Sequence, residues 1–220
     1  MGTTERELKN IMLSLDLNKK VIDEAIKKKC NLLITHHPLL FKPIKKIDVR
    51  QNNIAGIIEN LIKNNLTLYS AHTNFDYTKG GVSFQLAKRL KLHNIKFLNN
   101  LTENQVKLAV FVPEENLQEV ANAIHEAGGG IIGEYSNCSF RTPGTGTFQG
   151  SEASNPYIGE KEKTESVKEI KLEVLVDSWK IHKVIKAMMY VHPYEEPAYD
   201  IYPLKNKNVN YGSGAIGKIN

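Results

Sequence analysis

The sequence predicts an α/β protein: a helix-covered, mainly parallel sheet into which a second, smaller unit is inserted. Two observations predict this class. In the first hundred residues, short apolar runs rich in strand formers alternate with stretches whose apolar residues follow the helical period. After residue 103 the pattern changes, and a strand–helix–strand arrangement occurs twice. We therefore expect 1–103 to form the first part of the core, 104–206 the inserted unit, and 207–220 a linker that returns to the core.

The elements of the first part alternate between strand and helix. Apolar runs predict strands at 11–15, 31–37 and 66–70, and amphipathic stripes predict helices at 18–29, 51–64 and 81–92. This order is typical of parallel strands joined by right-handed helical crossovers.

Two adjacent histidines, His36 and His37, end the second of these strands. Pro38 follows them and cannot donate to a sheet, so the strand should stop there, with both imidazoles at its carboxyl end. Ligands bind at this edge in open α/β sheets. Because neighbouring strand residues point to opposite faces, the pair serves one site only if the chain leaves strand geometry or if two metal ions lie side by side. A histidine that caps the strand beside a solvated one would also explain the pair.

The third strand has the same form. Its apolar run is followed by His72 and Asp76, and His and Asp are ligands for Zn, Fe, Mn and similar ions. Two consecutive strands that both end in ligand-type residues favour a metal site at the shared edge. The alternative for Asp76 is an Asx turn or a helix N-cap.

The inserted unit contains an internal repeat. Lys107–Val112 and Lys171–Val176 agree at most positions, and the helices that follow them agree at the same spacing. Each half should read strand, helix, strand, which together make a ferredoxin-like βαββαβ unit. The expected elements are strands at 106–112, 131–140, 169–176 and 198–204, and helices at 115–127 and 181–190.

Two further stretches of the inserted unit have special composition. The glycine-rich run Pro143–Gly150 lacks the spacing and the following helix of a phosphate loop, so we expect a hairpin, followed by a charged loop at 151–166. His192-Pro-Tyr-Glu-Glu-Pro197 is held stiff by its prolines and should present its side chains outward. This segment is either a rigid turn or a second ligand or substrate contact.

Composition excludes several classes of protein. Of the 220 residues, 41% are hydrophobic and 24% charged, as in ordinary globular proteins, and no apolar run is long enough to span a bilayer. Two cysteines without CxxC spacing indicate a reducing cytoplasm and a metal site made of N and O ligands. The net charge of +5 comes from dispersed lysines, which makes nucleic-acid binding unlikely.

Three blocks of the sequence, Ile34–Phe41, Ala71–Asp76 and His192–Asp200, resemble the signature blocks of the NGG-interacting-factor-three-like dinuclear metal proteins, called GTP cyclohydrolase I type 2 homologues. Thr142–Phe148 resembles the bacterial members with an inserted PII- or CutA-like domain. The resemblance implies two divalent metal ions held by His36, His37 and Asp76, with His72 beside them as a possible catalytic residue. It also implies a cytoplasmic, ring-shaped homohexamer.

The resemblance leaves two functions open. One is a metal-dependent hydrolase of the GTP cyclohydrolase I type 2 kind, in which metal-activated water attacks a small-molecule substrate. The other is a non-catalytic metal-binding or regulatory hexamer. The family completes its metal centre with a His and a Glu near the C-terminus, and the sequence stops at Asn220 before such a segment. We therefore expect a chain shortened at both ends, whose second metal site is incomplete.

Overall fold

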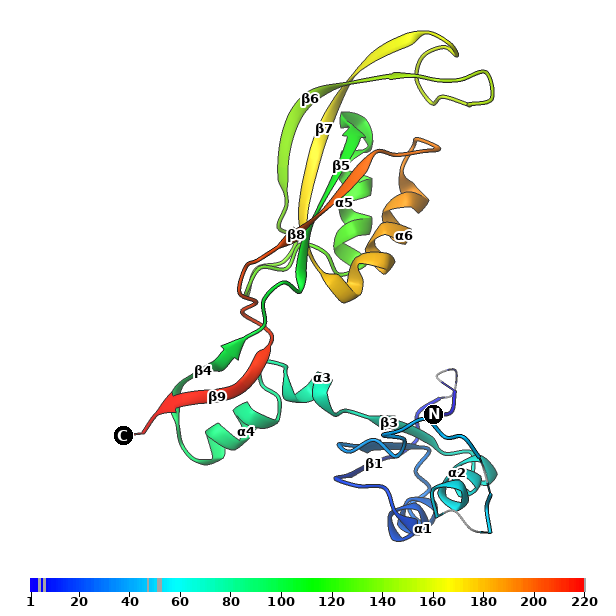
Figure 1. The fold of residues 1–220 in the computed structure, drawn as a ribbon, viewed down its shortest axis with the longest axis vertical. Helices are drawn as coiled ribbons and strands as arrows, with labels where there is room; N and C mark the ends of the chain where they lie inside the picture. The colour runs from blue at the N-terminus through cyan, green and yellow to red at the C-terminus, as the bar shows by residue number, and fades with distance from the viewer. Residues whose placement is uncertain (4, 6, 47, 51–52, 220) are drawn as a thin grey trace. The chain divides into compact units, whose positions relative to one another are not determined.

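The computed structural model describes residues 1–3, 5, 7–46, 48–50 and 53–219. These residues form two compact units (Figure 1). Unit 1 comprises Met1–Lys96 and Gly214–Asn220, and unit 2 comprises Phe97–Ser213. The chain is a mixed α/β protein with a parallel sheet in unit 1 and an antiparallel sheet in unit 2.

Unit 1 contains a three-stranded parallel sheet in the order β1-β2-β3. Its strands are β1 (Ile11–Ser14), β2 (Leu32–Thr35) and β3 (Thr67–Ser70), and its longer helices are α1 (Lys19–Lys27), α2 (Asn53–Lys63) and α4 (Val82–Arg89). The four-residue helix α3 (Thr73–Asp76) follows β3. The predicted strands and helices of this part are confirmed within a few residues, although Gln51 and Asn52, where the second helix was expected to begin, lie outside the described residues.

The core of unit 1 lies between one face of this sheet and two helices. Leu33 of β2 is paired with Leu68 of β3, and both are buried against Ile22 and Ala25 of α1 and Leu61 of α2. Helix α1 begins at Asn18, whose side chain accepts a hydrogen bond from the backbone N–H of Val21 at 3.1 Å, as an N-cap does. This packing fixes the direction of the three strands, so that their carboxyl ends meet at one edge.

Unit 2 has the βαββαβ order of a ferredoxin-like fold. Its sheet has the order β6-β7-β5-β8, and all its neighbouring strands are antiparallel. The elements are β5 (Gln105–Pro113), α5 (Leu117–Glu126), β6 (Phe140–Gln149), β7 (Thr164–Asp177), α6 (Ile181–Val191) and β8 (Tyr199–Leu204). Helices α5 and α6 lie side by side over one face of the sheet (Figure 1).

The core of unit 2 is built from the repeat seen in the sequence. Leu108 and Val110 of β5 and Leu172 and Val174 of β7 occupy every second position of their strands and pack against Val120 of α5 and the rest of the helix pair. All five are at most 1% exposed. The equivalent positions of the two halves therefore meet in one hydrophobic cluster, which the period of two along each strand produces.

Two predictions about unit 2 are wrong. The second strand is not at 131–140: that segment contains only the isolated pair Ile132–Tyr135, and the strand runs from Phe140 to Gln149. The glycine-rich run is therefore most of strand β6 and not a hairpin. The prolines and glycines disfavour a strand by propensity, but β6 is an edge strand, where a proline is tolerated. At Gly146 a Cβ would lie 2.2 Å from Oε2 of Glu169, so a larger residue there would displace that carboxylate.

Three more strands were not predicted at their true extent. β4 (His93–Asn100) pairs with β9 (Gly212–Lys218) in a separate two-stranded sheet, and β9 occupies residues expected to be a linker. β4 is mostly polar and β9 contains three glycines, so neither has the continuous apolar signal of a buried strand. Strand β7 also begins at Thr164, inside the segment expected to be a charged loop.

The helices of the described residues include none that is long and apolar enough to cross a membrane.

Candidate metal centre

The three histidines predicted from the strand ends lie together in unit 1. One ring nitrogen from each of His36, His37 and His72 can be chosen so that all three atoms lie within 4.8 Å of one another. The ring centroids are 5.1 Å apart for His36 and His37, 5.0 Å for His36 and His72, and 5.8 Å for His37 and His72. The imidazoles therefore converge on one point at the carboxyl edge of the parallel sheet.

The adjacent histidines reach one site because strand β2 ends before them. β2 stops at Thr35, and the Thr35 hydroxyl donates to the backbone carbonyl of His37 at 2.9 Å, which bends the chain at this point. The backbone N–H groups of His36 and His37 still donate to the carbonyls of Ser14, the last residue of β1, and Leu15, the residue after it. The chain thus leaves strand geometry, as the sequence required for a shared site, while β1 still anchors it.

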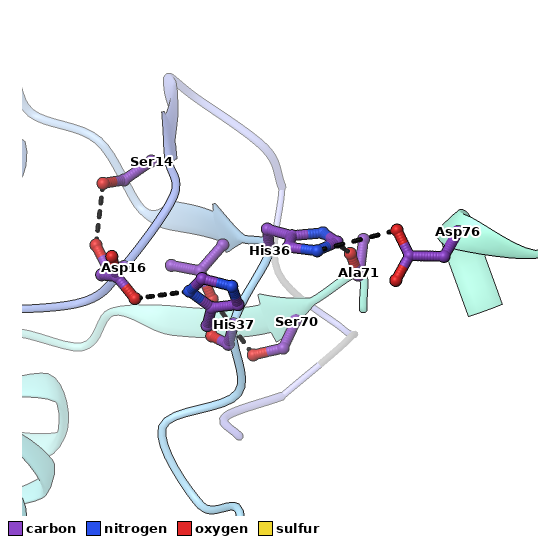
Figure 2. A network of polar contacts seen from close by, with 8 residues as sticks. Ser14, Asp16, His36, His37, Ser70, Ala71 and Asp76 are labelled. Carbon is purple, nitrogen blue, oxygen red and sulfur yellow. Dashed lines mark hydrogen bonds and ion pairs between the residues drawn. The ribbon is translucent and has the colours of Figure 1, made fainter. Parts of the chain in front are cut away.

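His72 and Asp76 are positioned by the short helix α3. The His72 carbonyl accepts hydrogen bonds from the N–H groups of Phe75 at 2.8 Å and Asp76 at 3.0 Å, so His72 begins the single turn that ends in Asp76. This turn brings Oδ1 of Asp76 to 3.7 Å from Nε2 of His36. Figure 2 shows His36 reaching toward Asp76 on one side while His37 faces Asp16 on the other.

Two of the imidazoles have one nitrogen engaged and the other available. Nδ1 of His36 lies 2.9 Å from the carbonyl oxygen of Ala71, and Nδ1 of His37 lies 2.7 Å from Oδ1 of Asp16 (Figure 2). Because a carbonyl or carboxylate oxygen can only accept, a neutral imidazole bound to it carries its proton on Nδ1. Nε2 of both rings then carries the lone pair, and that of His36 faces Oδ1 of Asp76 at 3.7 Å; this is the tautomer of histidine that binds metal ions through Nε2.

Asp16 is the residue of this site that the sequence argument missed. It lies just after β1, whose carboxyl end shares an edge with those of β2 and β3, and its backbone carbonyl accepts a hydrogen bond from Ser14 Oγ at 2.7 Å. The predicted metal site was based only on the ligand-type residues that follow the second and third strands. The same rule applied to the first strand would have found the carboxylate.

The segment at His192–Pro197 belongs to unit 2. Its side chains were expected to point outward, but not all of them do. His192 is buried, and its Nε2 lies 3.1 Å from the carbonyl oxygen of Phe111, while its Nδ1 accepts a hydrogen bond from the Tyr194 N–H at 3.1 Å. Burial lowers the pKa of His192, only partly offset by the Phe111 carbonyl and the Glu169 carboxylate. A neutral His192 thus ties the end of α6 to strand β5.

Comparisons with known proteins agree with this picture. The family model Duf34/NIF3 (NGG1p interacting factor 3) matches residues 1–218. Proteins named "GTP cyclohydrolase 1 type 2 homolog" from Halalkalibacterium halodurans and Bacillus subtilis are 44% and 42% identical over all of this chain. The crystal structure of a Bacillus cereus protein related to NIF3 superposes with a TM-score of 0.74 at 42% identity, covering 99% of this chain and 57% of that one.

The chain spans 59% of the length of both of these relatives. The match runs through both units and includes the strand ends that carry the histidines. On this evidence the chain belongs to the Duf34/NIF3 family.

Proposed function

We propose that this chain carries the metal-binding part of a metal-dependent hydrolase, with His36, His37 and Asp76 as metal ligands and His72 beside them. The convergence of three imidazoles within 4.8 Å, two of them held with Nε2 available, carries this proposal. The relatives' name, GTP cyclohydrolase 1 type 2 homolog, supports a nucleotide as the substrate class.

The donor set fits a divalent transition-metal ion. Imidazole nitrogens and carboxylate oxygens are ligands that Zn, Fe and Mn accept. Asp76 is not part of the three-histidine cluster, but its Oδ1 faces that cluster 3.7 Å from Nε2 of His36. The Ala71 carbonyl and the Asp16 carboxylate orient two of the rings from behind, as the outer partners of metal-binding histidines do. Two ions about 3.5–4 Å apart, as the family resemblance implies, would need ligands beyond these four side chains.

A divalent ion held here would lower the pKa of a coordinated water to near neutrality and so supply a nucleophilic hydroxide. The chain's own residues would orient and move protons. Asp16 and the Ala71 carbonyl hold the Nδ1 protons of His37 and His36, which keeps both rings in one tautomer. His72, whose Nδ1 lies 3.3 Å from Thr73 Oγ1, is a candidate to transfer a proton to or from the substrate.

For GTP, two hydrolytic steps would follow in sequence. Addition of one water to C8 of the guanine base opens its five-membered ring and leaves a formamide, and a second water releases that carbon as formate. The alternative is a non-catalytic metal-binding or regulatory assembly, expected from the family resemblance to be a homohexamer. The independent core of unit 2 favours it, because a separate ferredoxin-like unit is a common form of ligand-sensing domain.

The first experiment measures metal content by mass spectrometry on the purified chain and on the double variant His36→Ala/His37→Ala. The matched control, His93→Ala/His182→Ala, removes two exposed imidazoles that lie outside the cluster. We expect the first variant to lose the metal of the unchanged chain and the control to keep it. Equal metal content in all three, or none in any, would contradict the metal site.

Incubation of the metal-loaded chain with GTP then separates the two functions. Formate release that is lost in the His36→Ala/His37→Ala variant supports the hydrolase. Metal bound without formate release removes the cyclohydrolase reaction and leaves the regulatory assembly. A His72→Ala variant assigns that side chain: retained metal with lost turnover identifies a proton carrier, and lost metal identifies a ligand.

A further inference from the structure

Unit 2 contains a cavity of ≈ 400 Å³ that the proposed metal centre does not use. This volume lies within the range of about 300–1,000 Å³ that is typical of small-molecule sites. Its floor comes from strands β5 and β7, and its walls come from the segment after β6 and the segment after α6. The side chains that carry the argument are those of Phe148, Tyr157, Glu169, Tyr194 and Glu196.

Aromatic rings form much of the wall. The ring of Tyr194 neighbours those of Phe148, at a centroid distance of 6.4 Å, and Tyr157, at 6.1 Å, and both pairs are tilted. His192 also packs edge-on against Tyr194 at 5.2 Å and holds that segment in place. The faces of aromatic rings carry negative potential, which attracts cations.

The charged groups of this wall are all negative. Glu169 is only 8% exposed, and its carboxylate lies against the bare backbone of Gly146, where a Cβ would approach Oε2 to 2.2 Å. Glu195 and Glu196 also line the cavity, and no lysine or arginine does. Among the ion pairs of the described residues, none includes Glu169. A buried carboxylate without a cationic partner is costly, so this wall favours a positive ligand.

The Tyr194 hydroxyl adds a directed polar group. It is buried close enough to the Glu169 carboxylate to donate toward it, although no acceptor among the described residues meets strict hydrogen-bonding geometry. Burial, together with the Glu169 carboxylate, raises the pKa of Tyr194, so the phenol keeps its proton. By contrast, Glu195 already has a structural role, because its Oε1 accepts a hydrogen bond from the Asn155 N–H at 2.8 Å and ties the wall segments together.

We propose that this cavity binds a small organic cation, an amidinium- or guanidinium-type group joined to a flat apolar body, with Glu169 facing the charge and Tyr194 and Phe148 flanking the body. A planar cation can donate two parallel hydrogen bonds to one carboxylate, which fixes its orientation. The site lies wholly within unit 2 and does not depend on the metal centre.

The test uses three molecules of the same shape and different charge: benzamidinium, benzamide and benzoate. Binding to the full 220-residue chain is measured by isothermal titration and by NMR. We expect benzamidinium to bind about tenfold more tightly than benzamide, and benzoate not to bind, because a cation over aromatic faces and beside a carboxylate gains on the order of this factor. Equal affinity for all three, or no binding of benzamidinium at about 10 mM, near the weak end of the affinity scale, would overturn the proposal.

Variants of single carboxylates locate the site. Glu169→Gln keeps the shape of the side chain and should weaken benzamidinium about tenfold without changing benzamide, as loss of a charge-assisted pair predicts. Glu173→Gln, on the same strand but outside the cavity, is the matched control and should have no effect. If the buried Glu169 variant fails to fold, the exposed Glu196→Gln variant should still weaken benzamidinium. Equal effects of the cavity and control variants would contradict the site.

Discussion

The contact between Asp16 and His37 gives the sharpest test of the metal centre. Asp16 is not expected to bind the ion itself: its Oδ1 lies 2.7 Å from Nδ1 of His37, on the side of the ring away from the cluster (Figure 2). Its removal by Asp16→Ala therefore leaves every proposed ligand in place. The variant loses only the group that fixes the tautomer and orientation of His37.

The size of the effect follows from exposure. Removing such an outer partner typically lowers metal affinity by about 10–100-fold. The side chains of His37 and Asp16 are 48% and 60% exposed, so water can replace the carboxylate in part and the effect should lie at the lower end. We expect Asp16→Ala to weaken zinc binding about tenfold, which corresponds to roughly 1.4 kcal/mol. Asp16→Asn should weaken it less, because the amide oxygen can still accept from Nδ1.

The assay is competition for Zn²⁺ between the chain and a chelating dye. Glu24→Ala is the control, since it removes one exposed carboxylate of the same unit, from an i,i+4 pair with Lys28 at 3.4 Å, and changes the net charge equally. Its zinc affinity should match that of the unchanged chain. If Asp16→Ala and Glu24→Ala gave the same affinity, the idea that Asp16 orients His37 would be refuted.

Three further predictions concern stability and metal binding. The folded-state pKa of His192 lies below its ordinary value of 6.5, so its neutral form contributes stability that is fully present above about pH 6.5 and is lost as the pH falls toward the folded pKa. Between about pH 7 and 5, the melting temperature of the His192→Gln variant should therefore fall less than that of the unchanged chain. An equal fall of the two melting temperatures would contradict this role. A Cβ at Gly81 would lie 1.9 Å from the Phe75 carbonyl oxygen, so Gly81→Ala should displace helix α3 and weaken metal binding. Gly56 lies in the interior of α2 with open space around it. Gly56→Ala should therefore stabilise the chain by about 0.5–1 kcal/mol in urea unfolding, because alanine loses less backbone entropy on folding than glycine. A loss of stability in this variant would contradict that reasoning.

Some errors of the sequence argument have a common physical origin. Local apolar pattern located the buried strands, but β6 carries glycine and proline and was assigned to a hairpin. What makes it a strand is its pairing with β7, from Phe140 opposite Glu173 to Gln149 opposite Thr164. Such pairing is a long-range property, and propensity near the edge of a sheet predicts it poorly.

The sequence by itself determined the alternation of elements in unit 1, the repeat in unit 2 and three histidines at strand ends, because each depends on spacing along the chain. Only the tertiary structure decided that His36, His37 and His72 converge and that Asp16 supports His37, since these depend on strand order and direction. It also buried His192, which had been expected to point outward, and enclosed Glu169 in a cavity with aromatic walls. Burial is decided by what packs against a residue, and here the packing elements lie far away in the sequence.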